Sequence, residues 1–185
     1  MQMRVLAENM EAADPQQRRL REFSAALAEK LRATPSAEQM PARLAVRIGE
    51  ERYLLDMAFA GEIVSVPAIA PVPWTKPWFR GLANVRGRLV GVVDLPNLAG
   101  RAPLPAELAQ QVLVFGSALN VNAGLLITRA FGLRNLKDLR ALDAAAADPA
   151  TPWLGRRFAE ADGSVLAELD LARLVTSELF TSIGV

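Results

Sequence analysis

Apolar residues recur at every second position from residue 43 onward, in short runs that glycine and proline interrupt. The first run covers residues 43–48, with its larger apolar side chains at alternate positions: Leu44, Val46 and Ile48. A turn at Gly49 follows, and a second run begins at Tyr53. Because side chains of a strand point alternately to its two faces, this period predicts a β-hairpin with one buried face.

Later segments repeat the pattern. Further strands are predicted at 63–66, 88–93, 112–115, 123–127 and 165–169, the third and fourth of these forming a hairpin around 117–122. Turn residues close most of them, such as Pro67 after the first and Arg86-Gly87 before the second. Many short strands with Gly and Pro turns favour small β-barrels over a parallel sheet. The fold class expected is therefore mainly β.

A weak internal repeat points to two similar barrels. Residues 87–98 can be laid on residues 163–174 so that a glycine, an aspartate and two leucines coincide. Each copy reads as a turn, a buried strand, and an aspartate (Asp94 or Asp170) that caps a short helical turn. Four coincidences over this length can arise by chance, but Trp78 and Trp153 also lie nearly in step. The repeat favours two barrels.

Residues 1–41 follow a different rule. Asp14-Pro15 reads as an N-cap with proline at the first helical position, and one apolar stripe follows at three- and four-residue steps: Leu20, Phe23, Leu27 and Leu31. We expect an amphipathic helix and a linker up to Pro41, before a β domain at 42–180. The helix either docks on its own domain or engages a partner.

Composition excludes several function classes. The chain has no cysteine and no histidine, so thiolate nucleophiles, imidazole bases and the commonest transition-metal ligands are missing. Its net charge of +1 gives no strong field toward nucleic acid or anionic lipid. No apolar run approaches the ~20 residues of a membrane span, and the N-terminus lacks a signal-peptide pattern. We expect a cytoplasmic, non-enzymatic protein without cofactor or metal.

The stretch from Trp74 to Leu95 carries the most information. Three prolines stiffen its approach, and Trp78 and Phe79 are expected to plug one end of a barrel. Aromatic and arginine side chains on a rigid segment are also the types that anchor protein interfaces. An apolar strand then enters the core and ends at Asp94.

Here the sequence resembles a known family. The string Trp-Phe-Arg-Gly-Leu-Ala-Asn-Val-Arg-Gly at 78–87, with an apolar strand ending Val-Val-Asp-Leu, is similar to the signature of the CheW-like domain. Gly61-Glu62-Ile63 resembles the family's upstream Glu-Ile element, and 124–127 resembles the glycine-led strand of its second half. The resemblance covers about residues 43–175.

The resemblance implies two intertwined five-stranded, SH3-like barrels and no catalysis. Members of the family bridge chemoreceptors and a CheA-type histidine kinase, pair with the kinase's regulatory domain, and bind receptor-tip helices in an apolar groove. The family's partner-binding positions fall here on Glu62, Ile63, Asn84 and Arg86. It implies that Arg86 contacts a partner or braces the groove, and that Glu62 pairs with a basic group.

Two departures refine the resemblance. The family commonly has an aspartate after the second glycine-led strand, whereas Thr128-Arg129 follows Ile127 here. The longer N-terminal extension and the Pro-Trp-rich approach look more like the PilI-type adaptors of type IV pilus (twitching motility) chemosensory systems. Pilus control would then be the output.

Two other functions stay open. Arg80, Arg86 and Arg88 beside Trp74 and Trp78 have the composition of a single-strand nucleic-acid stacking platform. The low net charge argues against that alternative. An enzyme would need a pair of carboxylates such as Asp94 and Asp170, but both are expected to serve as helix caps.

Overall fold

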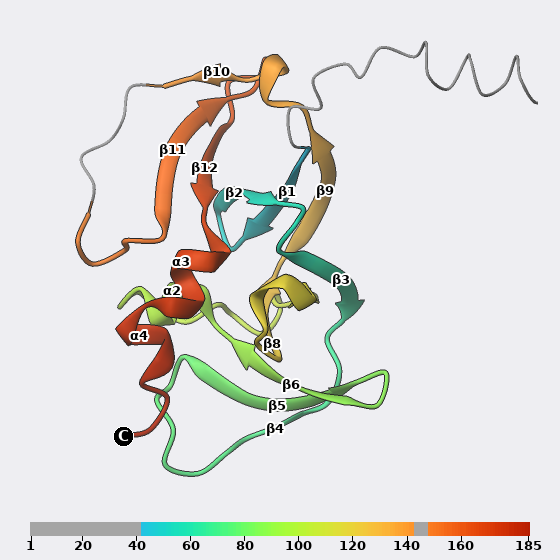
Figure 1. Ribbon diagram of the computed structural model, residues 1–185, viewed down its shortest axis with the longest axis vertical. Helices are drawn as coiled ribbons and strands as arrows, with labels where there is room; N and C mark the ends of the chain where they lie inside the picture. The colour runs from blue at the N-terminus through green and yellow to red at the C-terminus, as the bar shows by residue number, and fades with distance from the viewer. Residues whose placement is uncertain (1–41, 143–147) are drawn as a thin grey trace, which may run out of the picture. The chain divides into compact units, whose positions relative to one another are not determined.

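The computed structural model describes residues 42–142 and 148–185. The predicted N-terminal helix and linker lie outside these residues. Within them, the chain forms twelve strands in two mixed sheets, with a few short helices between (Figure 1). The prediction of a mainly β fold with two subdomains is confirmed.

Sheet A has the strand order β10-β11-β12-β2-β1-β9. Its strands are β1 (Arg43–Ile48), β2 (Glu51–Asp56), β9 (Arg129–Arg134), β10 (Arg140–Ala141), β11 (Leu154–Ala159) and β12 (Val165–Leu169). Sheet B has the order β3-β7-β8-β6-β5-β4. Its strands are β3 (Ala60–Ser65), β4 (Ile69–Ala70), β5 (Phe79–Val85), β6 (Arg88–Val93), β7 (Gln111–Phe115) and β8 (Ala123–Ile127). Each sheet thus has five longer strands and one of two residues.

Short helices connect or follow the strands. They are α2 (Leu95–Leu98), α3 (Leu171–Thr176), α4 (Glu178–Thr181) and the 3-10 turns η2 (Ser117–Leu119) and η3 (Leu136–Asp138). After α4 the chain returns to the beginning of the stretch from Trp74 to Leu95, where the amide of Lys76 donates to Ile183 O at 2.8 Å.

The two sheets have the same topology with one hairpin exchanged. Strands β1 and β2 lie in sheet A, yet the next strands, β3 to β6, lie in sheet B; likewise β7 and β8 lie in sheet B and β9 to β12 in sheet A. In each sheet the exchanged hairpin pairs in parallel with the other half, as β2 with β12 and β8 with β6. The two halves are therefore intertwined, as the resemblance implied, and neither sheet is complete without both.

Backbone hydrogen bonds bear out the internal repeat. Trp78 O accepts from the amide of Asp94 at 2.8 Å, and Trp153 O accepts from the amide of Asp170 at 2.9 Å. Each aspartate then caps its helix, α2 or α3, by accepting a backbone amide with its side chain. The hydrogen bonds tie tryptophan, aspartate and helix together in the same way in both halves.

The main core joins the two sheets. It includes Val46 and Tyr53 of sheet A and Val92 and Leu125 of sheet B, each at most 1% exposed. Trp78 is 5% exposed and stacks on Phe180 of α4 with ring centroids 6.1 Å apart, while Phe79 meets it edge-on. Trp78 is thus a residue of the main core. A smaller cluster fills sheet A alone: Ala45, Leu54, Phe158 and Leu166.

Candidate functional site

The hairpin between β5 and β6 presents one of the predicted arginines on a tight turn. Val85 ends β5 and Arg88 begins β6, so Arg86 and Gly87 form the two-residue loop, with φ of 51° and 83°. Positive φ at both central positions is the mark of a type I′ turn, in which asparagine or glycine usually occupies the first position. The side-chain Oδ1 of Asn84 accepts from the amide of Gly87 at 2.8 Å and fixes the turn.

Glu62 reaches this turn from the opposite edge of sheet B. Strand β3 carries a bulge between Ala60 and Ile63, and bulges re-aim side chains at sheet edges. A Cβ at Gly61 would lie only 2.8 Å from Val114 O, so the bulge needs glycine there. Because two strands, β7 and β8, separate β3 from β6, sheet B must curl strongly for Glu62 to meet the hairpin.

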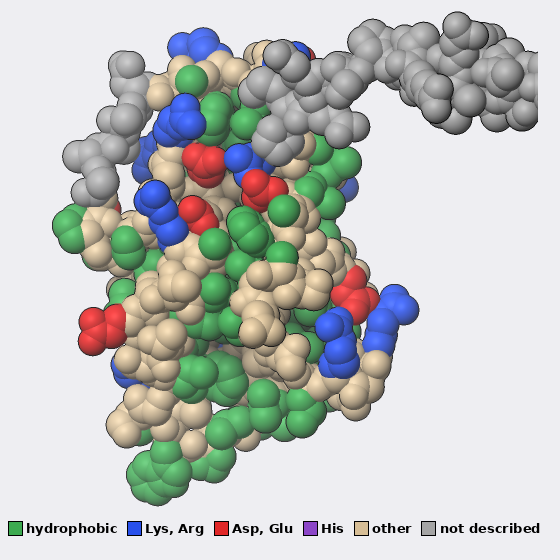
Figure 2. Space-filling model, viewed as in Figure 1, with side chains coloured by type: hydrophobic (Ala, Val, Ile, Leu, Met, Phe, Trp, Pro, Cys, Tyr) green, Lys and Arg blue, Asp and Glu red, His purple; other side chains and the backbone are tan. Residues whose placement is uncertain are grey.

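Two arginines share the Glu62 carboxylate. Arg86 Nε lies 2.6 Å from Glu62 Oε2, and Arg88 Nη2 lies 3.3 Å from Oε1. Figure 2 shows an acidic side chain next to basic ones at the side of the molecule where the β5–β6 hairpin projects. The prediction that Glu62 pairs with a basic group is confirmed. We call Glu62, Asn84, Arg86, Arg88 and Leu89 the hairpin surface.

Ile63, the fourth predicted residue, has a different place. It lies opposite Leu113 of β7 and packs, half-buried, against the main core. Two residues of this surface were not predicted from the sequence. One is Arg88, the second partner of Glu62. The other is Leu89, which is 64% exposed and pairs with Asn84 across the hairpin. Arg88 directly follows the turn, and that spacing was the available signal.

The ion pairs on the hairpin surface contribute little to stability. Arg86 and Arg88 side chains are 78% and 55% exposed, and exposed pairs contribute about 0–1 kcal/mol. A side chain other than glycine, asparagine or aspartate in the left-handed region costs about 1 kcal/mol. An arginine at this turn position therefore brings no net stability.

The alternative nucleic-acid platform is not assembled. Trp78 is buried, Arg80 pairs with Asp94 at 3.3 Å, and the other two arginines pair with Glu62. Trp74 is 84% exposed, but no second exposed aromatic ring of the interleaved set stands beside it among the described residues.

Asp94 is a structural group rather than a catalytic one. It is fully buried, and its carboxylate accepts from the amides of Asn97 and Leu104 as well as pairing with Arg80. Burial raises the pKa of Asp94, while the backbone hydrogen bonds and Arg80 act in the opposite direction. All its acceptor capacity is directed into the protein.

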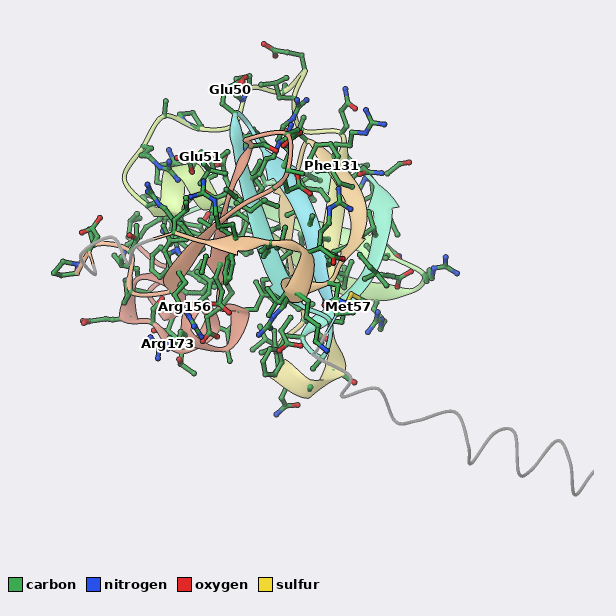
Figure 3. The ribbon with its side chains drawn as sticks, turned by 90° about the horizontal axis from the view of Figure 1, so that it is seen from above. Glu50, Glu51, Met57, Phe131, Arg156 and Arg173 are labelled. Atoms are coloured by element: carbon green, nitrogen blue, oxygen red, sulfur yellow. The ribbon has the colours of Figure 1, made fainter. Side chains whose placement is uncertain are left out.

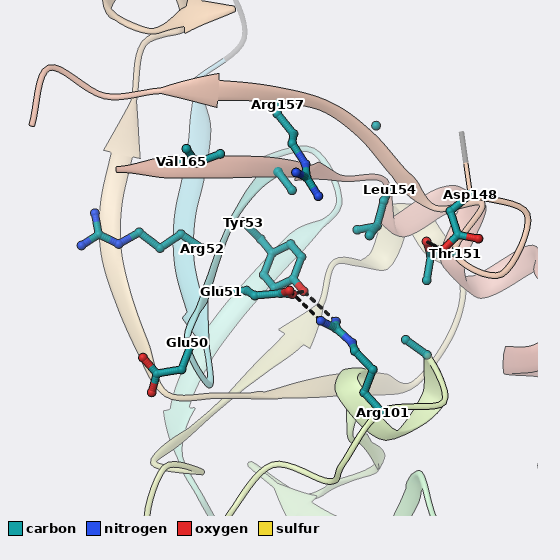
Figure 4. Close-up of a pocket in the computed structure, with 13 residues that line it drawn as sticks. Glu50, Glu51, Arg52, Tyr53, Arg101, Asp148, Thr151, Leu154, Arg157 and Val165 are labelled. Atoms are coloured by element: carbon teal, nitrogen blue, oxygen red, sulfur yellow. Dashed lines mark hydrogen bonds and ion pairs between the residues drawn. The ribbon is translucent and has the colours of Figure 1, made fainter. Parts of the chain in front are cut away.

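A cleft of about 560 Å³ lies where β2, β11 and β12 meet the loop after α2. At its floor, Arg101 donates to Glu51 at 2.6 Å and to the hydroxyl of Tyr53 at 3.2 Å, and Tyr53 in turn donates to Glu51 (Figure 4). Since Arg101 follows the β3–β6 segment and the other two belong to β2, this network ties sheet A to the connection from sheet B. Charged residues border the cleft, so it differs from the apolar groove that the family implies.

Burial and the neighbouring carboxylate of Glu51 raise the pKa of Tyr53 to about 12. Because a raised phenol pKa stabilises the fold below pH 10, we expect a loss of about 2–3 kcal/mol as pH rises from 10 to 12. Tyr53 is the chain's only tyrosine, so near-ultraviolet phenolate absorbance reports it directly. The native midpoint should lie near 12 and the midpoint in denaturant near 10.

Tyr53→Phe is the control for this titration. The variant should lose the phenolate signal, and its stability should fall less steeply over the same alkaline range. The difference separates the effect of Tyr53 ionisation on stability from that of the lysines, which titrate in the same range. A native midpoint near 10 would contradict the buried network.

Among residues 42–142 and 148–185, no group of acidic side chains is arranged to hold a metal ion. In the same ranges, no helix has the length and apolarity needed to cross a membrane.

Residues 43–179 match the CheW-like domain family. The chain belongs to this family. Over 109 residues it is 34% identical to Protein PilI of Pseudomonas aeruginosa. These residues cover 59% of this chain and 61% of PilI. The predicted likeness to PilI-type adaptors is confirmed by that similarity. The chain thus spans less than two thirds of the length of this relative.

One further protein sequence and one crystal structure are also similar to this chain. The Chemotaxis protein CheW of Thermotoga maritima is 22% identical over 132 residues, which cover 71% of this chain and 85% of that protein. The crystal structure of the scaffolding protein TtCheW from Thermoanaerobacter tengcongensis has a TM-score of 0.61 at 17% identity, covering 76% of this chain and 95% of TtCheW. This structure supports the fold.

Proposed function

We propose that the protein is a non-enzymatic cytoplasmic adaptor that couples chemoreceptors to a CheA-type histidine kinase, in a system that controls type IV pili. The membership of residues 43–179 in the CheW-like domain family is the observation that carries this proposal. Similarity to PilI supports the pilus system over the flagellar one.

The hairpin surface is the proposed contact with a partner. It offers Arg86 on a rigid type I′ turn, with Glu62 holding the guanidinium in one orientation at 2.6 Å. A fixed guanidinium costs less conformational entropy to bind than a free one, and it matches a carboxylate in two hydrogen bonds. Ile63 and Asn84 would act indirectly, Ile63 by seating the bulged strand and Asn84 by fixing the turn.

The primary test is direct binding. The full chain should bind saturably to the regulatory domain of its CheA-type kinase and to the cytoplasmic tip of its receptor, measured by calorimetry or biolayer interferometry. Absence of binding to both partners at high micromolar concentration would overturn the proposal.

Arg86→Glu should weaken kinase or receptor binding by about tenfold, because a rim guanidinium is replaced by a repelling charge. Its melting temperature should change little, since the lost ion pair is exposed. Arg86→Asn is the matched control for the turn: it removes the charge and keeps a residue that favours the left-handed region, so it should weaken binding and leave stability equal or higher.

The double variant Glu62→Arg/Arg86→Glu separates two roles. If the ion pair acts by holding the turn, the exchanged pair should recover part of the lost affinity. If Arg86 itself contacts the partner, the exchanged pair should bind as weakly as Arg86→Glu alone. Wild-type affinity in every variant would remove the hairpin surface from the interface.

A further inference from the structure

Three arginines stand side by side across sheet A. In the strand register, Arg47 of β1 lies directly opposite Arg52 of β2 on one side and opposite Arg129 of β9 on the other. Directly paired residues project from the same face of a sheet, so the three guanidinium groups share one face. We call Arg47, Arg52 and Arg129 the arginine row.

The arginine row borders the small core of sheet A. Ala45 and Leu54, two positions along the same face, belong to that core. Phe131 of the edge strand β9 packs against the same core, with its ring centroid 5.1 Å from the guanidinium of Arg52 and 5.8 Å from that of Arg129. Seen from above in Figure 3, Phe131 lies on the β9 side of the sheet.

Among the described residues, Arg52 is the member of the row that has carboxylate partners. Arg52 lies 3.3 Å from Glu160 and 3.9 Å from Asp162, and it donates to the hydroxyl of Ser164 at 2.6 Å. In residues 42–142 and 148–185, no carboxylate lies within 4.0 Å of Arg47 or Arg129.

Arg47 is the most costly member. Its Nε is buried and has no hydrogen-bond partner among the residues that the structure describes, whereas buried polar groups are satisfied in the great majority of cases. Like charges directly opposite each other in a sheet also destabilise it. Arg47 and the neighbouring Arg129 therefore present two adjacent positive charges, an arrangement that an incoming anion would relieve.

We propose that the arginine row is a docking surface for an acidic segment of a partner protein, which places carboxylates between Arg47 and Arg129. Three adjacent strands span about 10 Å, which suits two neighbouring acidic side chains of one peptide. Phe131 supplies an apolar contact beside the charges. The row lies on sheet A and the hairpin surface on sheet B, so this inference does not depend on the proposed function.

The surroundings favour a short acidic peptide over a nucleic acid. Glu160 and Asp162 already occupy the Arg52 side of the row, and Glu50 is exposed at the β1–β2 turn. A continuous phosphate backbone would meet these carboxylates as it left the arginines. Arg52 also lines the border of the cleft, but in Figure 4 its side chain points away from Glu51, Tyr53 and Arg101.

The test uses the full chain with a fluorescently labelled short polyglutamate peptide, a matched polyglutamine peptide, inorganic phosphate and a mixed-sequence single-stranded oligonucleotide. Polyglutamate should bind, with affinity that falls as salt is added, and polyglutamine should not. Amide shifts in nuclear magnetic resonance spectra should map its binding to β1, β2 and β9.

Arg129→Gln should weaken polyglutamate binding about threefold to tenfold, and Arg129→Lys should retain most of it. Arg156→Gln is the matched control, because Arg156 is an exposed arginine of sheet A that Figure 3 places far from Phe131, and it should bind as wild type. Equal losses in Arg129→Gln and Arg156→Gln would overturn the proposal. So would phosphate or oligonucleotide binding at the row that exceeds polyglutamate binding.

Discussion

Replacing Asp94 with alanine is expected to lower the free energy of unfolding by about 2–4 kcal/mol, because a helix cap is lost and a buried backbone amide is left without an acceptor. The carboxylate is fully buried and accepts from the amides of Asn97 and Leu104. Without it both amides lack a partner, and Arg80, 3.3 Å away, loses its counter-charge. Urea denaturation followed by tryptophan fluorescence measures the loss.

The internal repeat provides the matched control. Asp170 caps α3 as Asp94 caps α2, but its side chain is 40% exposed and its ion pair with Arg173 is local. Asp170→Ala should cost about 1 kcal/mol, the usual contribution of an N-cap. Equal losses in the two variants would show that the burial of Asp94 adds nothing to its role as a cap.

Alternation and turn residues were sufficient to predict much of the fold. The hairpins β1–β2 and β7–β8 were predicted from alternating or continuous apolar runs, and β6 was predicted with its observed bounds. Five strands were missed: β4 and β10, which have two residues each, and the longer strands β5, β9 and β11. Their exposed glycines, arginines and asparagine hide the period, since Gly132 and Gly155 have no side chain and Arg156 and Arg157 are consecutive.

Strand exchange could not be predicted from the pattern alone. Alternation specifies which face of a strand is buried, but it does not specify the neighbouring strand. Nothing in residues 60–65 indicates that β3 leaves the sheet of β2 and joins β7. Only the resemblance to the CheW-like domain carried the expectation of intertwined halves.

For the functional surfaces too, some residues could be predicted from the sequence and others could not. Glu62 and Arg86 were predicted through the family signature, and the structure brings them to 2.6 Å. The arginine row was beyond prediction, because Arg47, Arg52 and Arg129 meet only through the register of three strands, one of them from the other half of the chain. Register is a tertiary property wherever two strands are far apart in sequence.

Gly81→Ala is expected to lower the free energy of unfolding by about 3 kcal/mol or more, since backbone strain and steric overlap both act there. Gly81 has φ of 127°, a region that side chains rarely adopt, and an added Cβ would lie 2.1 Å from Ala70 O. Because Ala70 pairs with the neighbouring Leu82, the added methyl group would force β4 away from β5. Chemical denaturation measures the loss.

Gly87→Ala is the control that separates conformation from space. Gly87 has φ of 83°, but no atom lies within 4 Å of the position of its Cβ. The variant should therefore cost only the left-handed backbone penalty of about 1–2 kcal/mol. If Gly81→Ala were no more costly than Gly87→Ala, the close approach of β4 would not be the reason for glycine in β5. We expect instead that position 81 requires glycine because β4 lies so close to it. Position 87 requires glycine because the turn that presents Arg86 needs a positive φ there.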